Sequence, residues 1–239
     1  MSESLLKIEC VDKLGVLLQK KKRIKILVGG RASTKTIFVA DYVLSQVMSG
    51  KRWCCAREFQ NSIDDSVHQT LLDEIQRLEV TGFEPKRSEI DHNSGGRAFY
   101  KGLARNITSL KGVNAHGLWI EEGEGLSAQT LKILTASIRV TPLEAKEAAL
   151  RGEIVETPEI WVTMNRGSRA DQVAKKLLSR AENELARCGY YEDDLMIVIE
   201  VNYNDNPWFA DSGLEVERLD DKEHLSLAEY DSKWLGKYY

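Results

Sequence analysis

One stretch near the N-terminus combines residue types that bind phosphate groups. It follows an apolar run that ends at Val28 and leads into a sequence compatible with helix. The stretch, called the phosphate loop below, consists of Gly29, Gly30, Arg31, Ala32, Ser33, Thr34, Lys35 and Thr36. Backbone N–H groups of a glycine turn and of a helix N-terminus converge on one anion. The order of strand, glycine turn and helix start therefore predicts a nucleotide-binding loop.

The spacing inside the phosphate loop assigns roles to its last two residues. Gly29 precedes Lys35 by six positions, so Lys35 is expected to reach the β- and γ-phosphates of ATP and the Thr36 hydroxyl to ligate Mg²⁺. Thr34 stands where this motif has its second glycine, which leaves less room for the backbone to approach phosphate. The alternative that the pattern leaves open is a plain strand-to-helix turn that binds nothing.

A second stretch places two carboxylates directly after a buried strand. Glu121 and Glu122 follow the apolar run 117–120. Ligands of open α/β sheets bind at the carboxyl ends of strands, where the phosphate loop is also expected. Glu121 is predicted to hold Mg²⁺, which prefers one or two carboxylates, and Glu122 to orient and polarise the attacking water. The alternative is a strand that ends in solvated acids, and the nearby Glu124 fits that too.

Three further residues have types suited to sensing or stabilising the phosphate charge. Asn165 ends the apolar run 161–164 and offers an amide that senses the γ-phosphate. Arg31 is placed to neutralise transition-state charge within its own subunit, and Arg139 to do so for a neighbouring subunit. Such an arginine contributes roughly 10³- to 10⁵-fold in rate in well-studied NTPases. For both arginines a surface salt bridge is the alternative.

The composition excludes several classes of protein. The chain has 239 residues, 42% hydrophobic and 29% charged, which is ordinary for a soluble globular protein with one α/β domain. A net charge of −4 argues against coating nucleic acid through bulk charge, and the basic run Lys20–Arg23 is interpreted as solvated surface. No segment approaches the roughly 20 apolar residues that span a bilayer, so no membrane is expected. The cysteines, at 10, 54, 55 and 188, show no metal-site spacing and are expected to be reduced thiols.

The remaining elements alternate between strands and helices. Apolar periodicity predicts helices over 3–19, 35–50, 63–78, 127–138 and 172–188, with a charged helical tail from residue 212. It predicts strands over 23–28, 51–56, 117–120, 160–164 and 195–201, a hairpin pairing 88–92 with 97–103, and an inserted loop over 140–158 with one or two helical turns. The alternation predicts parallel βαβ units, with a sheet that is covered on both faces.

These segments together resemble the ATPase domain of the large terminase subunit of tailed double-stranded DNA phages. The matching segments, in family order, are VGGRASTKT, CCAREF, SEIDHNSGGRAFYKGL, LKGVNAHGLWIEEGEGLS, LTASIRV, WVTMN, VNYNDNPWF and YDSKWLGKYY. The resemblance implies a RecA-like (ASCE) P-loop NTPase with a mainly parallel sheet. It implies a helical lead-in over 1–22, an ATPase core over 23–205 and a small C-terminal lid or linker segment over 206–239. Lys35 and Thr36 match the triphosphate and Mg²⁺ ligands, Glu121 and Glu122 the Walker B pair, Asn165 the coupling motif, and Arg31 and Arg139 the loop arginine and the trans-acting finger.

The resemblance also implies partners and an activity. A Mg²⁺-dependent ATPase is expected to move double-stranded DNA into a procapsid in the host cytoplasm, as a homo-oligomeric ring with the portal protein and the small terminase subunit. The chain departs from the family at Thr34, at Arg166, where proline is frequent, and in the longer insertion 140–158. It stops where the nuclease domain of the family is expected, so no nuclease activity is predicted. A helicase-like motor and a nucleotide-binding assembly module with little turnover are the alternatives.

Overall fold

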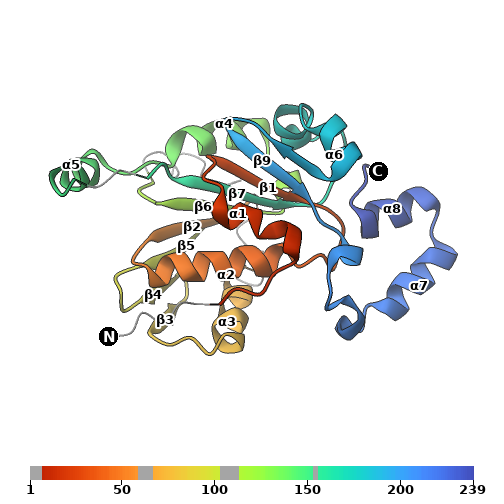
Figure 1. The fold of residues 1–239 in the computed structure, drawn as a ribbon, viewed down its shortest axis with the longest axis horizontal. Coiled ribbons are helices and arrows are strands. Elements are labelled where there is room, and N and C mark those ends of the chain that lie inside the picture. Colours follow the sequence, from red (N-terminus) through yellow and green to blue (C-terminus); the bar gives the residue numbers. More distant parts are fainter. Residues whose placement is uncertain (1–6, 59–66, 103–112, 153–155) are drawn as a thin grey trace.

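A nine-stranded sheet forms the centre of the molecule in a computed structural model, which describes residues 7–58, 67–102, 113–152 and 156–239 (Figure 1). The strand order is β3-β4-β5-β2-β6-β7-β1-β9-β8. Six neighbouring strands are parallel, namely β5 (Arg97–Gly102), β2 (Arg52–Arg57), β6 (Gly117–Glu121), β7 (Glu159–Met164), β1 (Ile24–Val28) and β9 (Met196–Glu200). The antiparallel strands are β3 (Phe83–Lys86), β4 (Glu89–His92) and β8 (Tyr190–Glu192).

The order of the central strands determines where the predicted motifs meet. Strand β1, which leads into the phosphate loop, pairs with β7, and β7 pairs with the acidic strand β6. One strand therefore separates the phosphate loop from the carboxylates, as the ASCE arrangement requires. The predicted fold class, a RecA-like P-loop fold with a mainly parallel sheet, is confirmed.

Helices cover both faces of the sheet, so the parallel strands are apolar on both sides (Figure 1). The helices are α1 (Val16–Gln19), α2 (Lys35–Met48), α3 (Val67–Arg77), α4 (Ala128–Ser137), α5 (Pro142–Leu150), α6 (Glu182–Cys188), α7 (Glu215–His224) and α8 (Leu227–Leu235). On one face, Phe38 of α2 and Leu71 of α3 belong to the same buried cluster as Trp119 and Trp161. On the other face, Leu131 of α4 is buried among the strand residues.

The structure corrects two predicted helices. The leading helix predicted over 3–19 is a 3₁₀ turn, Asp12–Leu14, followed by the short α1, and its first residues lie outside the described part. Its apolar side chains, such as Leu14 and Leu17, pack onto the sheet without a continuous helix. The helix predicted over 172–188 is divided into a π-helical segment, Ala174–Leu178, and α6.

The sequence pattern also missed two edge strands. Strand β3 is short, largely exposed and contains Pro85, so it lacks the apolar alternation of a strand. Strand β8 has only three residues and reverses direction at Asp193 to pair with β9. The hairpin of β4 and β5 is confirmed, and the turns expected in the insertion are α5, which begins with a capping box of Thr141 and Glu144.

The C-terminal residues form a helical unit beside the phosphate loop. Helices α7 and α8 lie at one end of the molecule, where the chain returns past β1 (Figure 1). Phe209, Tyr230 and Trp234 form a small core of their own, against which Ala32 of the phosphate loop packs. The predicted helical tail is thus confirmed. Among the described residues, no helix has the length and apolar content needed to cross a membrane.

Candidate nucleotide-binding site

The structure brings the phosphate loop and the acidic strand end together. A cavity of about 420 Å³ at the carboxyl edge of the sheet is lined by both segments. Its lining residues are Gly30, Arg31, Ala32, Ser33, Thr34, Lys35, Thr36, Ile37, Glu121, Glu122, Glu124, Thr163, Met164, Asn165 and Leu214. Helix α2 begins at Lys35, so the N–H groups of its first turn, which have no partner inside the helix, face this edge. This concave site has helix N–H groups and a lysine on one side and carboxylates on the other.

Lys35 is buried at the floor of the cavity. Its Nζ donates to the carbonyls of Gly29 (2.9 Å) and Gly30 (2.6 Å), to Ser33 Oγ (2.8 Å) and to Asn165 Oδ1 (3.2 Å). Burial lowers the pKa of Lys35 to about 8, against the opposing effect of the nearby carboxylates. The amine remains protonated at neutral pH, and it touches both the phosphate loop and the amide predicted to sense phosphate.

Glu121 sits opposite the start of α2. Its carboxylate accepts a hydrogen bond from the Thr36 side chain. Burial raises the pKa of Glu121, and Arg57, Lys35 and Thr36 oppose that rise. The Thr36 hydroxyl and the Glu121 carboxylate are thus adjacent oxygen donors beside the space for phosphates. They fit the donor set that Mg²⁺ prefers, which is few protein ligands supplemented by phosphate oxygens and water.

Arg57 lies at the site, although the sequence pattern did not predict a role for it. It ends β2, next to β6, and its Nε lies 2.7 Å from Glu121 Oε2 while its Nη2 pairs with Glu122. The Arg57 side chain is buried, whereas 58% of the Glu122 side chain is exposed. Like Glu121, Arg57 is a polar residue at the carboxyl end of an apolar strand, so the same sequence signal could have predicted its place at the site.

Backbone strain marks three residues that line the cavity, namely Ala32 (φ +56°), Thr34 and Glu122. Thr34 has φ +62° and Glu122 has φ +55°, a left-handed conformation that non-glycine residues rarely adopt. The left-handed backbone at Thr34 explains why this position favours glycine in such loops. The buried Thr34 Oγ1 has no hydrogen-bond partner among the described residues. The sequence predicted that the Thr34 side chain leaves less room for phosphate, and the structure shows in addition that its backbone is left-handed.

The two predicted arginines lie at different edges of the sheet. Arg31 is exposed and lines the cavity. Arg139 is exposed as well, but it forms a β-bridge with Asn114, which precedes β6 and lies at the amino edge of the sheet. Arg139 therefore does not reach the cavity of its own subunit.

Lysines of the basic run Lys20–Arg23, together with Lys51 and Arg52, form ion pairs within the chain. Lys20 and Lys22 pair with Glu192, and Lys21 pairs with Glu156. Lys51 also pairs with Glu156, as Arg52 does with Glu144. The interpretation of the run as solvated surface agrees with these exposed or half-exposed ion pairs.

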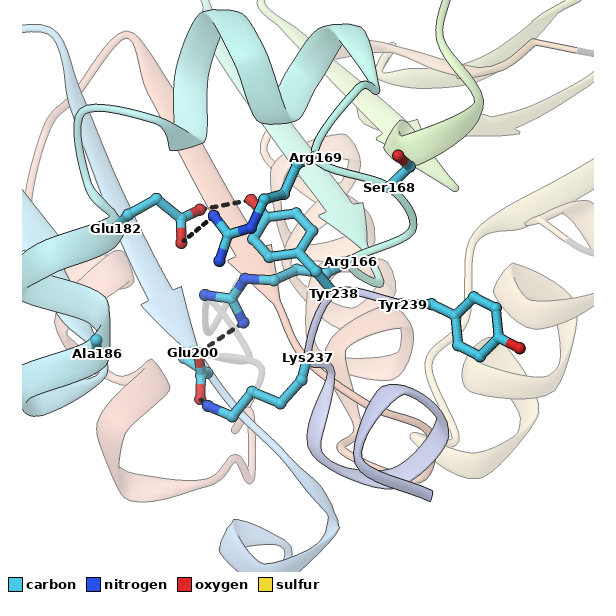
Figure 2. A pocket seen from close by; sticks show the side chains of 9 residues that line it. All are labelled: Arg166, Ser168, Arg169, Glu182, Ala186, Glu200, Lys237, Tyr238 and Tyr239. Carbon is cyan, nitrogen blue, oxygen red and sulfur yellow. Dashed lines mark hydrogen bonds and ion pairs between the residues drawn. The ribbon is translucent and has the colours of Figure 1, made fainter. Parts of the chain in front are cut away.

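A second cavity, of about 490 Å³, lies between the loop that follows β7 and the C-terminal tail (Figure 2). It contains none of the predicted site residues. Its lining includes Arg166, Arg169 and Lys237, with Glu182 and Glu200 as counter-charges. Within the described part of the chain, no cluster of three or more histidine, cysteine or acidic side chains forms a metal site.

Comparisons with known proteins give a consistent result. A family model described as phage terminase large subunit matches residues 21–237. No match was found among curated protein sequences. The large terminase of a thermophilic bacteriophage superposes with a TM-score of 0.65 at 12% identity, over 92% of this chain and 49% of that chain. That phage protein has also been solved in complex with ADP (TM-score 0.62, 13% identity, 90% of this chain and 48% of that chain).

Two isolated domains match over nearly their full length. The ATPase domain of a Thermus phage large terminase matches with a TM-score of 0.60 at 10% identity, over 95% of this chain and 92% of that chain. The N-terminal domain of the DNA packaging ATPase from bacteriophage phi29 matches with a TM-score of 0.55 at 12% identity, over 82% of this chain and 96% of that chain. By contrast, the chain spans only about half the length of the thermophilic phage large terminase described above.

Proposed function

Because the chain belongs to the phage terminase large subunit family, we propose that it is the ATP-hydrolysing motor domain that powers translocation of double-stranded DNA into a procapsid. One observation carries this proposal. The phosphate loop and the pair Glu121 and Glu122, some ninety residues apart in sequence, line a single cavity at one edge of the sheet. A triphosphate in that cavity would contact helix N–H groups and a buried lysine on one side, and on the other it would face carboxylates suited to hold Mg²⁺ and the attacking water.

The residues of the cavity divide the work of hydrolysis. Lys35 binds the β- and γ-phosphates once its amine leaves the loop carbonyls, and Thr36 and Glu121 hold Mg²⁺. The ion, when bound, neutralises charge on the phosphates. Glu122 orients and polarises the attacking water, for which it must first leave Arg57. Asn165, already bonded to Lys35, senses whether the γ-phosphate is present.

The two arginines are assigned to stabilising transition-state charge. Arg31 lines its own cavity and acts in cis. Arg139, at the opposite edge of the sheet, acts in trans on the cavity of a neighbouring subunit. That assignment requires a homo-oligomeric ring, in which each site is completed by a neighbouring subunit. The isolated domain is therefore expected to be a slow ATPase. The partners proposed for the ring are double-stranded DNA, the portal protein and the small terminase subunit, in the host cytoplasm.

The substitution Glu122→Gln tests the enzymatic role. It removes the water-polarising carboxylate while preserving side-chain size, so we expect ATP turnover to fall by about 10²- to 10⁴-fold. Nucleotide affinity, measured by calorimetry, is expected to change little. The matched control is Glu223→Gln on the exposed face of α7, which leaves turnover unchanged. Unimpaired turnover in Glu122→Gln would remove the basis of the assignment.

One observation favours a second candidate function, a nucleotide-binding assembly module with little turnover. Arg57 pairs with both carboxylates, which holds Glu122 away from an attacking water. ATP that stays bound but unhydrolysed, even when the subunits are assembled on DNA, would select this second function.

A further inference from the structure

The C-terminal segment holds the base of the phosphate loop through its backbone. The Gly30 N–H donates to Asn202 Oδ1 at 2.7 Å, and the Arg31 N–H donates to the Lys233 carbonyl at 2.9 Å. A Cβ atom at position 30 would overlap the Trp234 carbonyl, so α8 reaches its place only because this residue is glycine. The N–H groups at the base of the loop are thus bound to protein, while those of the first turn of α2 face the cavity.

This contact bears on the two strained residues of the loop. Ala32 (φ +56°) and Thr34 (φ +62°) are both left-handed. Asn206 Nδ2 donates to the Ala32 carbonyl at 2.8 Å. Strained backbone persists where surrounding contacts over-determine it. The C-terminal segment therefore acts as a brace that keeps the loop in a conformation it would not hold alone.

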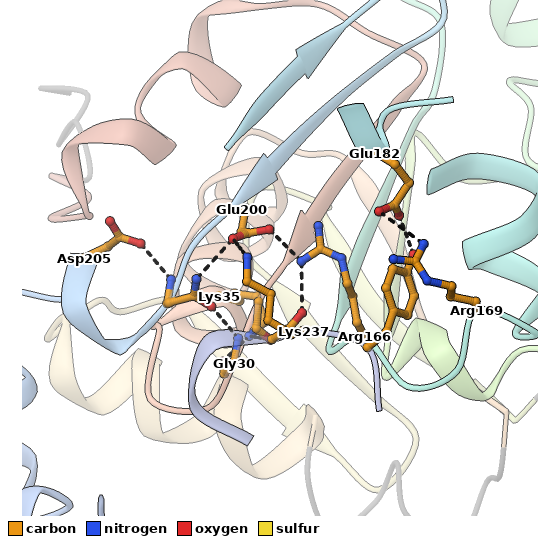
Figure 3. Close-up of polar contacts among 12 residues, drawn as sticks. Gly30, Lys35, Arg166, Arg169, Glu182, Glu200, Asp205 and Lys237 are labelled. Atoms are coloured by element: carbon orange, nitrogen blue, oxygen red, sulfur yellow. Dashed lines mark hydrogen bonds and ion pairs between the residues drawn. The ribbon is translucent and has the colours of Figure 1, made fainter. Parts of the chain in front are cut away.

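A buried carboxylate, Glu200, connects this brace to two other parts of the molecule (Figure 3). Glu200 Oε1 accepts hydrogen bonds from Asn202 Nδ2 (3.5 Å) and Lys237 Nζ (3.1 Å). Glu200 Oε2 accepts one from Arg166 Nη1 at 2.6 Å. Glu200 is 9% exposed and Arg166 is 5% exposed. Removing either partner of an ion pair so buried is costly, so the pair persists in the folded state, and the Asn202 side chain lies against it.

Arg166 extends the network into the C-terminal tail, residues 236–239 (Figure 2). Its Nη1 also donates to the Gly236 carbonyl at 2.9 Å. The Tyr238 ring lies between two guanidinium groups, 5.5 Å from that of Arg166 and 4.3 Å from that of Arg169. The Tyr238 hydroxyl donates to Glu182. The tail is thus docked by the residue that directly follows Asn165 in sequence.

We infer that Glu200 and Arg166 are positioning residues: they fix Asn202 and the docked tail so that the strained phosphate loop keeps its nucleotide-binding conformation. The inference rests on the proposed ATPase function and adds a coupling to it. A preorganised loop binds nucleotide more tightly than a loose one. By thermodynamic reciprocity, nucleotide that binds the braced loop strengthens docking of the tail by the same factor. Docking of the tail therefore depends on nucleotide occupancy.

Paired binding measurements test this coupling. The dissociation constant of the Mg²⁺ complex of adenylyl imidodiphosphate is measured by calorimetry for the wild type, Arg166→Ala and Tyr238→Ala. We expect both variants to bind about tenfold more weakly, within the roughly 5- to 150-fold range of typical couplings. Arg166→Lys is expected to recover only part of the affinity, because its amine still pairs with Glu200 but lacks the planar guanidinium that also lies against Tyr238. Because Tyr238 is only half-buried, we expect Tyr238→Ala to fold, and it provides the binding measurement if Arg166→Ala does not fold.

The reciprocal effect is measured by hydrogen–deuterium exchange of the tail. The Tyr239 N–H donates to the Gly167 carbonyl at 3.1 Å, and its exchange is expected to slow severalfold when the analogue binds. The control is Arg187→Ala on α6, which removes an exposed i,i+3 ion pair and leaves both readouts unchanged. Wild-type affinity in Tyr238→Ala, or tail exchange that ignores the analogue, would overturn the inference. A wild type that binds no nucleotide would instead overturn the proposed function on which it rests.

Discussion

Replacing Thr34 with glycine is expected to stabilise the protein, although it shortens a side chain next to a binding site. Two unfavourable features are removed together. The first is the left-handed backbone at φ +62°, which costs a non-glycine residue about 1–2 kcal/mol. The second is the buried Oγ1, which lacks a hydrogen-bond partner among the described residues, at a cost of about 1–3 kcal/mol.

The gain is reduced by the greater freedom of glycine in the unfolded chain, which costs about 0.5–1 kcal/mol. The net stabilisation expected for Thr34→Gly is therefore about 1–4 kcal/mol. For a chain of this length, each kcal/mol raises the melting temperature by about 2–4 °C. Thr34→Ala serves as the matched variant, because it removes the orphan hydroxyl but keeps a Cβ in the left-handed conformation.

Thermal unfolding and urea titration of the three proteins measure these effects. The order of stability is expected to be glycine, then alanine, then the wild type. A Thr34→Gly variant that melts below the wild type would refute the reasoning, since it would mean that the threonine is accommodated without strain. Equal stability of the two variants would assign the whole effect to the hydroxyl and remove the backbone argument.

Three further predictions concern charge. Burial and the neighbouring Glu74 raise the pKa of Asp41 to about 7. The folded state therefore binds a proton that the unfolded state releases, and the free energy of unfolding falls as pH rises from about 4 to 7. In Asp41→Asn the melting temperature should decline less over this range, and parallel curves for the two proteins would contradict the assignment. Burial raises the pKa of the half-buried Glu121 and Arg57 opposes that rise, so Arg57→Met should raise the pKa further and move the loss of Mg²⁺-dependent nucleotide binding to higher pH. An unchanged pH profile would show that the pairing does not matter. If Arg139 acts in trans, the specific ATPase activity of the wild type should rise with protein concentration and that of Arg139→Ala should not; a rise that survives the substitution would exclude the finger.

Local patterns predicted most of the residues that line the candidate nucleotide-binding cavity. The order of strand, glycine turn and helix predicted that Lys35 and Thr36 lie at the sheet edge, where they line the cavity, because a strand that feeds a helix through a glycine turn leaves the helix N-terminus there. The positions of Glu121 and Asn165 followed from one rule, that parallel strands of a sheet present their carboxyl ends on the same side. These inferences depend only on neighbours in sequence and on the geometry of parallel sheets.

The parts that the sequence missed depend on contacts between distant residues. The hydrogen bond from Gly30 to Asn202 joins residues 172 positions apart, and the pairing of Arg57 with Glu122 joins two strands whose adjacency only the strand order defines. No periodicity encodes which polar side chain meets which, because that choice is made by the packing of whole elements. The sequence by itself predicted which residues would face a bound phosphate and metal ion. The tertiary structure decided what holds them in place, since a strained loop and a buried ion pair are stable only inside the packed molecule.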